Sequence, residues 1–247
     1  MEEHNHSAEH HHVEHAHPPK NQNNSQQIAG AIIIAGVLIA GAVLIKGNTA
    51  PLPINAKTGI AAKVGLNVKN FNACLESGKF KAKVQADIDD GVKAGVNGTP
   101  SSFILKDGVV VDTIGGALPF ERVMEQIKGT RENTKTPIAN GMRPVTSDDH
   151  IVGNINAKII IVEYSDLECP FCKVFHNTMH QVVEQSNGDV AWVYRHYPIA
   201  QLHPKAFREA EATECAWAQK GNEGFWKYID KLFETTPSNN GLLESEL

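Results

Sequence analysis

The chain has 247 residues, of which 41% are hydrophobic, and its formal net charge is -5 at pH 7. This apolar content can fill one domain, or one domain with an insertion, even without the unusual N-terminal stretch. The negative charge and the lack of a basic cluster argue against a nucleic-acid partner. Four cysteines are too few for a disulfide-stapled miniprotein but suit one working pair and one structural pair.

Residues 1–27 form a histidine-rich tail, which we predict to be disordered because it has no apolar periodicity. Its histidines alternate with glutamate and other polar residues: His4, His6, His10, His11, His12, His15 and His17. Clustered imidazoles bind zinc, copper or nickel. A membrane-anchored metal-binding protein that uses this tail, with the rest of the chain as a scaffold, is therefore the alternative function. A solvated tail that binds metal only incidentally is the simpler interpretation.

An uncharged apolar run extends from Ile28 to Ile45. As a helix it would be about 27 Å long, close to the thickness of a bilayer core. We therefore predict a transmembrane helix at residues 28–45, followed by a linker at 46–56. A cleaved signal peptide is the rival interpretation, but its positively charged start and a convincing cleavage site are missing. Lys20 and Lys46 flank the run on opposite sides, so charge does not decide its orientation.

The next segment, residues 57–128, predicts helices followed by a hairpin. Residues 61–65 resemble a helix end, and Asn67 is a suitable N-cap for the next helix. A second amphipathic helix ends at Gly95 and carries apolar residues at every fourth position: Val84, Ile88 and Val92. Strands at 102–105 and 109–113 then flank a turn. Pro119 opens a helix to about residue 127, and residues 129–143 read as a polar linker.

The last segment, residues 144–247, predicts a strand, a helix and a second strand. Residues 158–164 have the β-branched run of a strand that is buried on both faces. A helix then runs to about residue 187, a strand follows at 189–196, and two further helices occupy about 204–220 and 224–235. Strand, helix and strand in this order form a right-handed crossover, so the predicted fold class is α/β.

The motif Cys169-Pro170-Phe171-Cys172 lies where the buried strand ends and a helix begins. The helix dipole and free backbone N–H groups favour a thiolate there, so Cys169 is the candidate nucleophile and Cys172 the resolving thiol. A structural disulfide and half a zinc site are the alternatives. Cys172, His176 and His180 are spaced four apart, but a finger-type zinc site needs a chain reversal between its ligand pairs. We predict no metal ligands and no cofactor in this site.

Three segments together resemble the DsbA-type thioredoxin-fold proteins of bacterial envelopes: VEYSDLECPFCKVFHNTMHQV, RHYPIAQLHPKAF and VNGTPSSFILKDG. The resemblance covers most of residues 145–247 and 60–129. It implies a thioredoxin-like fold with a helical insertion and disulfide exchange with secreted or envelope proteins through Cys169 and Cys172. It further implies a redox-recycling partner, which the sequence does not identify. The expected location is the cell membrane, with a single span and the C-terminal domain outside the cytoplasm.

The resemblance also implies roles for other residues. In the family a cis-proline loop faces the dithiol, which suggests that Thr99 and Pro100 dock the substrate backbone. A buried acid lies six positions before the nucleophile in the family, and Glu163 has that place here. Its implied role is proton exchange with Cys172, which needs a raised pKa. An ordinary carboxylate at a strand end is the alternative.

Cys74 and Cys215 each fall on a predicted amphipathic helix. The resemblance implies that these two residues form a structural disulfide in the helical subdomain. Two buried free thiols that behave as small hydrophobic residues are the alternative. A persistent disulfide requires an oxidising compartment, which is consistent with an extracytoplasmic domain.

The order of the two halves departs from the family. The cis-proline half, residues 57–128, precedes the CPFC half, residues 144–247, with residues 129–143 as the joining linker. This order predicts a circular permutation. We expect a permuted monomer first, an exchange of halves between two chains second, and a poorly stable product of a rearranged gene third.

Overall fold

The computed structural model describes residues 59–132, 137–138 and 140–247. These residues belong to one compact unit, residues 52–247. The predicted tail at 1–27, the transmembrane helix at 28–45 and the linker at 46–56 lie outside the described residues. Within the described ranges, no helix has the length and apolar character needed to cross a membrane.

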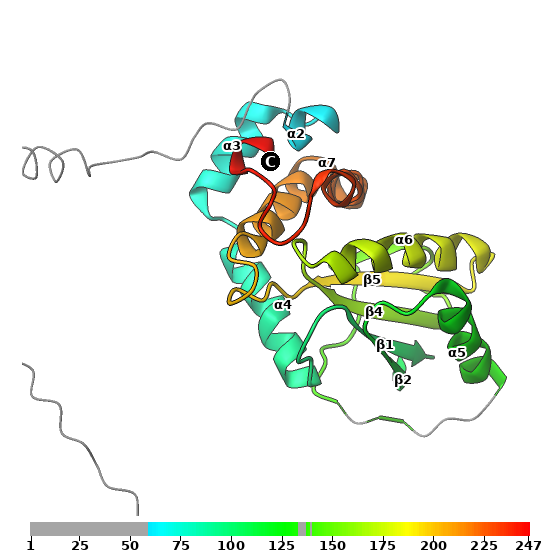
Figure 1. Ribbon diagram of the computed structural model, residues 1–247. Helices are drawn as coiled ribbons and strands as arrows, with labels where there is room; N and C mark the ends of the chain where they lie inside the picture. The colour runs from blue at the N-terminus through cyan, green and yellow to red at the C-terminus, as the bar shows by residue number, and fades with distance from the viewer. Residues whose placement is uncertain (1–58, 133–136, 139) are drawn as a thin grey trace, which may run out of the picture. The chain divides into compact units, whose positions relative to one another are not determined.

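A five-stranded mixed sheet, in the order β2-β1-β4-β5-β3, forms the centre of this unit (Figure 1). The central strands β4 and β5 are parallel, and the other neighbouring strands are antiparallel. The bounds are Ser101–Lys106 for β1, Val109–Gly115 for β2, His150–Val152 for β3, Ile159–Ser165 for β4 and Val190–His196 for β5. This confirms the predicted α/β, thioredoxin-like architecture.

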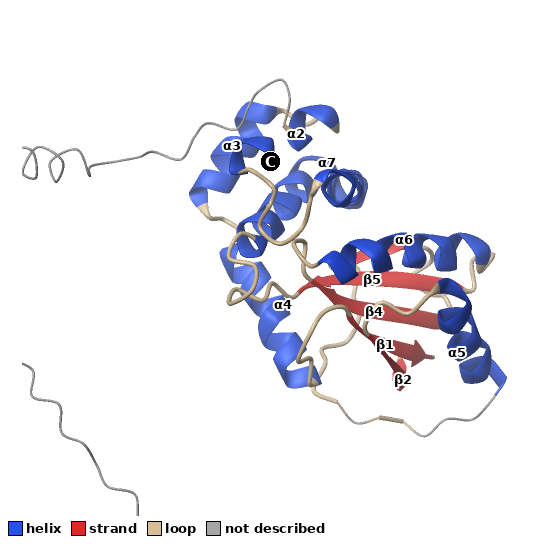
Figure 2. Ribbon diagram, in the orientation of Figure 1, coloured by secondary structure: helices blue, strands red, loops and turns tan. Residues whose placement is uncertain are grey.

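The helices form two groups (Figure 2). Helices α5 and α6 pack on each other and against the sheet, whereas α2, α3 and α4 pack against α7. The second group is the helical subdomain. The bounds are Ile60–Lys63 for α2, Val68–Ser77 for α3, Lys81–Ala94 for α4, Phe120–Glu132 for α5, Pro170–Gln185 for α6 and Ala206–Thr235 for α7, with a final 3-10 turn at Glu244–Glu246.

Strand β4 separates two hydrophobic cores because successive side chains point to opposite faces of a sheet. Ile159 and Ile161 pack into the core that includes α6, and Ile160 and Val162 pack into the core on the other face. All seven residues of β4 are buried, as the β-branched run predicted. Residue 163 therefore shares the α6 side of the sheet with Ile161.

Several helix ends follow the local sequence signals. The side chain of Asn67 accepts a hydrogen bond from the backbone N–H of Asn70, as expected for an N-cap. Gly95 ends α4 with φ of 87°, a left-handed conformation that suits glycine. Val92, in contrast, is 60% exposed, so the apolar residues spaced four apart on α4 do not all lie on its buried face. That face instead buries Val84, Asp87, Asp90 and Gly91.

The structure corrects one predicted boundary and adds one strand. Helix α5 continues to Glu132, so the first residues of the predicted linker are helical, because Gly129 is tolerated within a helix. The two helices predicted after residue 204 are both present: they share the label α7, and the backbone between them is non-helical at Lys220 and Gly221, where the sequence placed the break. The short strand β3 was not predicted, since its three residues carry too little pattern to be recognised.

Candidate dithiol site

Strand β4 and the loop after it place Cys169 at the start of α6. Cys169 is the N-cap residue, with extended backbone, and Pro170 occupies the first helical position. Proline suits this position because its missing N–H would have no partner within the helix. Cys169 and Cys172 are free thiols in this structure. Phe171 between them is 65% exposed and gives the site an apolar rim.

The surroundings of Cys169 favour its thiolate. The Cys172 thiol donates a hydrogen bond to it, and this is the main reason why its pKa falls to about 6. Burial opposes this fall, while the backbone N–H groups of Cys172 and Phe171 assist it. The positive end of the α6 dipole acts in the same direction. At neutral pH the Cys169 sulfur is therefore mostly ionised.

Cys172 has the opposite character. It is fully buried, and its sulfur accepts a hydrogen bond of 3.4 Å from the backbone N–H of Asp166. Burial, followed by the hydrogen bond to Cys169, raises the pKa of the Cys172 thiol well above its ordinary value. The pair thus combines an ionised sulfur at the helix start, in a residue that is 5% exposed, with a protonated sulfur that is fully buried.

The loop before β1 brings Thr99 and Pro100 to the dithiol. The peptide bond between these two residues is cis, as the resemblance implied. The Cys169 sulfur lies 3.5 Å from the carbonyl oxygen of Thr99, although the two residues are 70 positions apart. Pairing of β1 with β4 produces this approach, because Ser101 is opposite Tyr164 in the antiparallel register.

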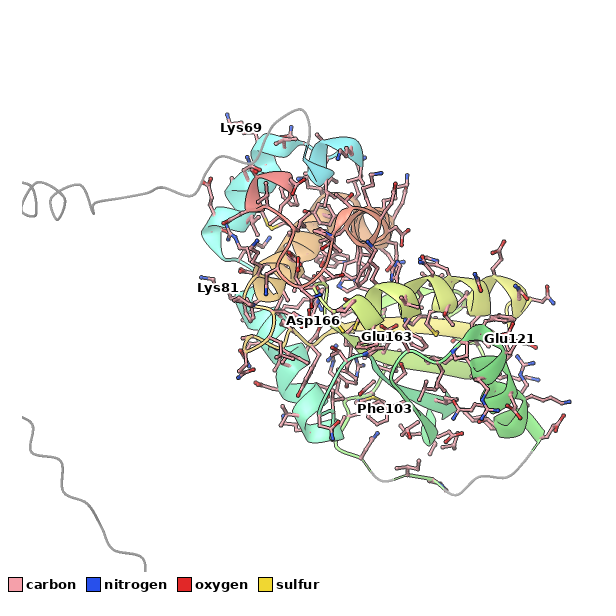
Figure 3. The ribbon with its side chains drawn as sticks, in the orientation of Figure 1. Lys69, Lys81, Phe103, Glu121, Glu163 and Asp166 are labelled. Carbon is pink, nitrogen blue, oxygen red and sulfur yellow. A yellow bond between two sulfur atoms is a disulfide. The ribbon has the colours of Figure 1, made fainter. Side chains whose placement is uncertain are left out.

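Glu163 lies on β4, on the side of the sheet that faces α6 (Figure 3). It is fully buried, and neither carboxylate oxygen has a hydrogen-bond partner at normal geometry. Burial raises the pKa of Glu163 to about 7, and weaker contacts from Ser165 and Trp192 only partly oppose this rise. The carboxyl group can therefore gain or lose a proton near neutral pH. An ordinary strand-end carboxylate would be exposed and would not have this property.

Asp166, which the sequence reasoning did not select, organises the loop before Cys169. Its buried carboxylate accepts hydrogen bonds from the backbone N–H of Glu168 at 2.8 Å and from that of Ile199 at 2.7 Å. His203 Nδ1 is 3.0 Å from the same carboxylate. Asp166 thus connects the chain before the nucleophile to the loop after β5. The sequence did contain a signal for Asp166: this acid comes directly after the β-branched run that predicts a buried strand.

Glu168, the residue before Cys169, was also missed. Its carboxylate accepts hydrogen bonds from the Thr236 hydroxyl and from the backbone N–H of Asn240. Burial and the neighbouring Glu168 raise the pKa of Glu209 to about 10. Glu209 is therefore protonated at neutral pH. These contacts attach the segment after α7 to the start of α6.

The second cysteine pair lies in the helical subdomain. Cys74 on α3 and Cys215 on α7 form a disulfide, with their Cα atoms 5.9 Å apart and 141 positions apart in the sequence. The pairing that the resemblance implied is thus present, and the alternative of two free thiols does not describe this structure.

Cys172, His176 and His180, which are spaced four apart on α6, do not together form a zinc site. The Cys172 sulfur contacts the backbone of Asp166, while the imidazoles of His176 and His180 both reach Asp230 on α7. Among the described residues, Cys172 belongs to no group of converging metal-ligand atoms. Asp230 was not anticipated, because nothing in the sequence links it to two histidines about 50 positions away.

Comparison with known proteins gives matches over both halves. The DSBA-like thioredoxin domain family matches residues 5–128, and a family described as Thioredoxin matches residues 145–243. Disulfide bond formation protein D of Bacillus subtilis is 29% identical over 109 residues, which are 42% of this chain and 49% of that protein. The crystal structure of Pseudomonas aeruginosa DsbA2 superposes with a TM-score of 0.39 and 36% identity, over 42% of this chain and 57% of that one.

A different kind of protein shares part of the sequence. Na(+)/H(+) antiporter NhaA 1 of Mycolicibacterium vanbaalenii is 39% identical over 94 residues, or 38% of this chain. The match spans only 15% of the antiporter. The DSBA-like match alone extends over half of the present chain. The chain therefore belongs to the DsbA-like thioredoxin-domain family.

Proposed function

We propose that this protein is a thiol-disulfide oxidoreductase that exchanges disulfides with secreted or envelope proteins through Cys169 and Cys172. One observation carries the proposal: a sulfur with a pKa of about 6 at a helix start lies 3.5 Å from the carbonyl of a cis-proline loop. A nucleophile, a resolving thiol and a backbone docking edge therefore meet at one place. Thiolates are the reactive species in disulfide exchange.

In the oxidising direction, a substrate thiolate attacks the Cys169 sulfur of the Cys169–Cys172 disulfide. The bond between the two cysteines breaks, a mixed disulfide forms with Cys169, and Cys172 leaves as a thiolate. A second substrate thiolate then attacks the substrate sulfur of the mixed disulfide and releases Cys169. Two electrons pass from the substrate dithiol to the cysteine pair. The reverse sequence reduces or isomerises a substrate disulfide.

Glu163 has the properties of the proton donor in this cycle. When Cys172 leaves as a thiolate, its buried sulfur needs a proton, because an isolated charge is costly in an apolar environment. A carboxyl group with a pKa of about 7 can supply this proton and recover it in the reverse step. Glu163 also raises the pKa of Cys172 electrostatically, so the two groups act on each other.

Thr99 and Pro100 have the proposed role of docking the substrate backbone beside Cys169. The proline carries no N–H group, so it cannot form the next backbone hydrogen bond of a strand. The Thr99 carbonyl already faces the Cys169 sulfur. An extended substrate segment that pairs here would hold its own sulfur next to Cys169.

The proposal includes an extracytoplasmic domain with a membrane anchor at residues 28–45. The Cys74–Cys215 disulfide supports the location, since structural disulfides persist in oxidising compartments. The proposal also includes a circular permutation of the family order. It is supported by the hairpin β1–β2, which precedes β4 in the chain and pairs beside it, and by a 2.8 Å hydrogen bond from Ala61 N–H to the Leu247 carbonyl.

Trapping of the mixed disulfide tests the proposed activity. A reduced, unfolded substrate protein with two thiols is incubated with the oxidised full-length chain. A single-thiol form of this substrate, which cannot release Cys169 by a second attack, is incubated with a Cys172→Ala variant pre-activated as a mixed disulfide with a small thiol. The wild type should oxidise the substrate, and the variant should accumulate a covalent complex through Cys169. Cys169→Ala should do neither. Substrate oxidation by Cys169→Ala at the wild-type rate would contradict the proposal.

A further inference from the structure

A second group of chemically active side chains lies on α6, beyond the dithiol, where this helix faces α7 (Figure 1). His176 and His180 are one turn apart on α6, and Asp230 comes from α7. The Oδ1 atom of Asp230 is 2.8 Å from His176 Nε2 and 2.9 Å from His180 Nε2, and the two Nε2 atoms are 3.2 Å apart. Three ligand-type atoms therefore converge on one point.

No arrangement of protons satisfies all three contacts. Each Nε2 atom carries at most one proton, which points in one direction, and the carboxylate oxygen carries none. If both imidazoles donate to Asp230, the two Nε2 atoms are 3.2 Å apart, both protonated, with no hydrogen bond between them. If only one donates, the other nitrogen and the oxygen are two acceptors in contact. A cation at the common centre would interact favourably with all three atoms.

The spacing also suits a small dication. Zinc binds imidazole nitrogen and carboxylate oxygen at about 2.0 to 2.2 Å, which places tetrahedral ligands about 3.3 Å apart. The observed separations of 2.8, 2.9 and 3.2 Å require only a slight expansion. Two imidazoles and one carboxylate are typical ligands for zinc among the common cations.

The packing around the imidazoles holds them in place. His176 is 3% exposed, and its ring lies 4.6 Å from that of Phe233 and 5.1 Å from that of Trp192, between centroids. The His180 ring is 5.2 Å from that of Trp192. A preorganised ligand set loses little conformational entropy when an ion binds.

The group is also accessible to solvent. It forms one wall of a cleft of about 650 Å³, which is lined further by Lys173, Asn177, Gln181, Phe233 and Glu234. His180 and Asp230 have 39% and 46% of their side-chain surface exposed. An ion can therefore enter, and a water molecule can complete the fourth position.

We propose that His176, His180 and Asp230 form a zinc-binding site with one open coordination position. The site is separate from the dithiol, because the Cys172 sulfur, one turn before His176, contacts the backbone of Asp166 instead. None of its ligands belongs to the histidine-rich tail. The proposal does not depend on the redox activity.

Calorimetric titration with Zn²⁺ tests the site on the full-length chain with its dithiol oxidised, so that Cys169 and Cys172 offer no thiolate. In every protein compared, the seven tail histidines are replaced by asparagine to remove their background binding. We expect one Zn²⁺ per chain. His180→Ala and Asp230→Ala should each weaken binding by at least roughly tenfold. Gln181→Ala, in the same cleft, is the matched control and should bind zinc like the parent.

Both test residues are partly exposed, so their replacement leaves the core intact, and unfolding midpoints verify this. Absence of zinc binding to the parent protein would overturn the proposal. Binding of equal strength by the parent, His180→Ala and Asp230→Ala would overturn it as well, because the ion would then occupy another place.

Discussion

The two faces of strands β4 and β5 each bury an ionisable side chain, Glu163 on one face and Arg195 on the other, in different surroundings. On the α6 face, Glu163 is buried without a hydrogen-bond partner at normal geometry, and its pKa is raised to about 7. On the other face, Arg195 is fully buried but contacts two acids: its guanidinium lies 2.9 Å from Asp149 Oδ1 and 2.8 Å from Asp90 Oδ2. The strand register confirms that Glu163 and Arg195 lie on opposite faces, because Glu163 pairs with Tyr194 and its neighbour Tyr164 pairs with Arg195.

The Arg195 cluster is closed by further contacts. Arg143 reaches the same two acids, at 3.2 Å to Asp90 and 2.8 Å to Asp149. The Tyr164 hydroxyl donates to Asp90. Burial alone would raise the pKa of Asp149, but the hydrogen bond and charge of Arg195 outweigh it and lower that pKa. Asp149 and Arg195 therefore stay charged at neutral pH. The cluster connects α4, the segment before β3, and the two central strands.

The presence or absence of an arginine partner distinguishes a buried acid that stabilises the fold from one that transfers a proton. A buried acid with an arginine partner keeps a fixed charge and serves stability. A buried acid without a partner titrates near neutral pH and can move a proton. The four experiments below change one face at a time and are ordered from the largest expected effect to the smallest.

Replacement of Arg195 by methionine should have the largest effect. It removes the shared cation of Asp90 and Asp149 and leaves buried carboxylates with fewer partners. We expect the free energy of unfolding to fall by about 3 to 5 kcal/mol. Denaturant unfolding of the oxidised protein measures this fall. A change below about 1 kcal/mol would show that the cluster is not the structural element described above.

The pH dependence of stability should identify Glu163. Its pKa is about 7 when folded and 4.5 ordinarily, so the folded state holds the proton more tightly. Stability from this group is complete below about pH 4.5 and is lost as the pH rises to 7, by about 3 kcal/mol in total. Glu163→Gln should remove this loss, since glutamine does not titrate. Parallel stability curves for the two oxidised proteins would refute the raised pKa.

Glu163→Gln should also slow disulfide exchange, because glutamine cannot deliver a proton to the leaving Cys172. We expect a loss of about hundredfold in rate, which corresponds to about 2.7 kcal/mol in activation free energy. Glu184→Gln, an exposed change on α6, is the matched control and should exchange at the wild-type rate. Equal rates for both variants would assign the proton to another donor.

Arg131→Met should have the smallest effect. It removes an arginine from an exposed ion pair and so serves as the comparison for Arg195→Met, which removes a buried one. Arg131 is 3.4 Å from Asp189, but their side chains are 39% and 60% exposed. Exposed ion pairs contribute about 0 to 1 kcal/mol. Denaturant unfolding should therefore show a loss several times smaller than that of Arg195→Met. Similar losses for both would mean that burial does not set the cost of removing an arginine here.

The sequence allowed prediction of the features that depend on short stretches. The β-branched run predicted β4, the CPFC motif at its end predicted the start of α6, and Asn67 and Gly95 marked helix ends. Thr99, Pro100 and Glu163 were identified by resemblance, and the structure places Thr99 beside Cys169. Their catalytic roles stay predictions that the experiments above address.

Features that depend on distant residues could not be predicted. Arg195 meets Asp90 across 105 positions, and His176 meets Asp230 across 54, so no local periodicity reveals either contact. Spacing alone also does not show burial: Val92 has the same helical spacing as Val84 and is still exposed. An arginine within the buried run VAWVYRH was a usable signal, since a buried arginine requires partners.

Alkylation of the reduced chain across a pH series, with the modified cysteine located by mass spectrometry, tests the central claim most directly. The claim is that α6 presents an ionised Cys169 and a protonated Cys172. The rate at Cys169 should rise with a midpoint near pH 6, and Cys172 should stay unreactive until far higher pH. Faster modification of Cys172, or a Cys169 midpoint near the ordinary thiol value of about 8.5, would contradict the account.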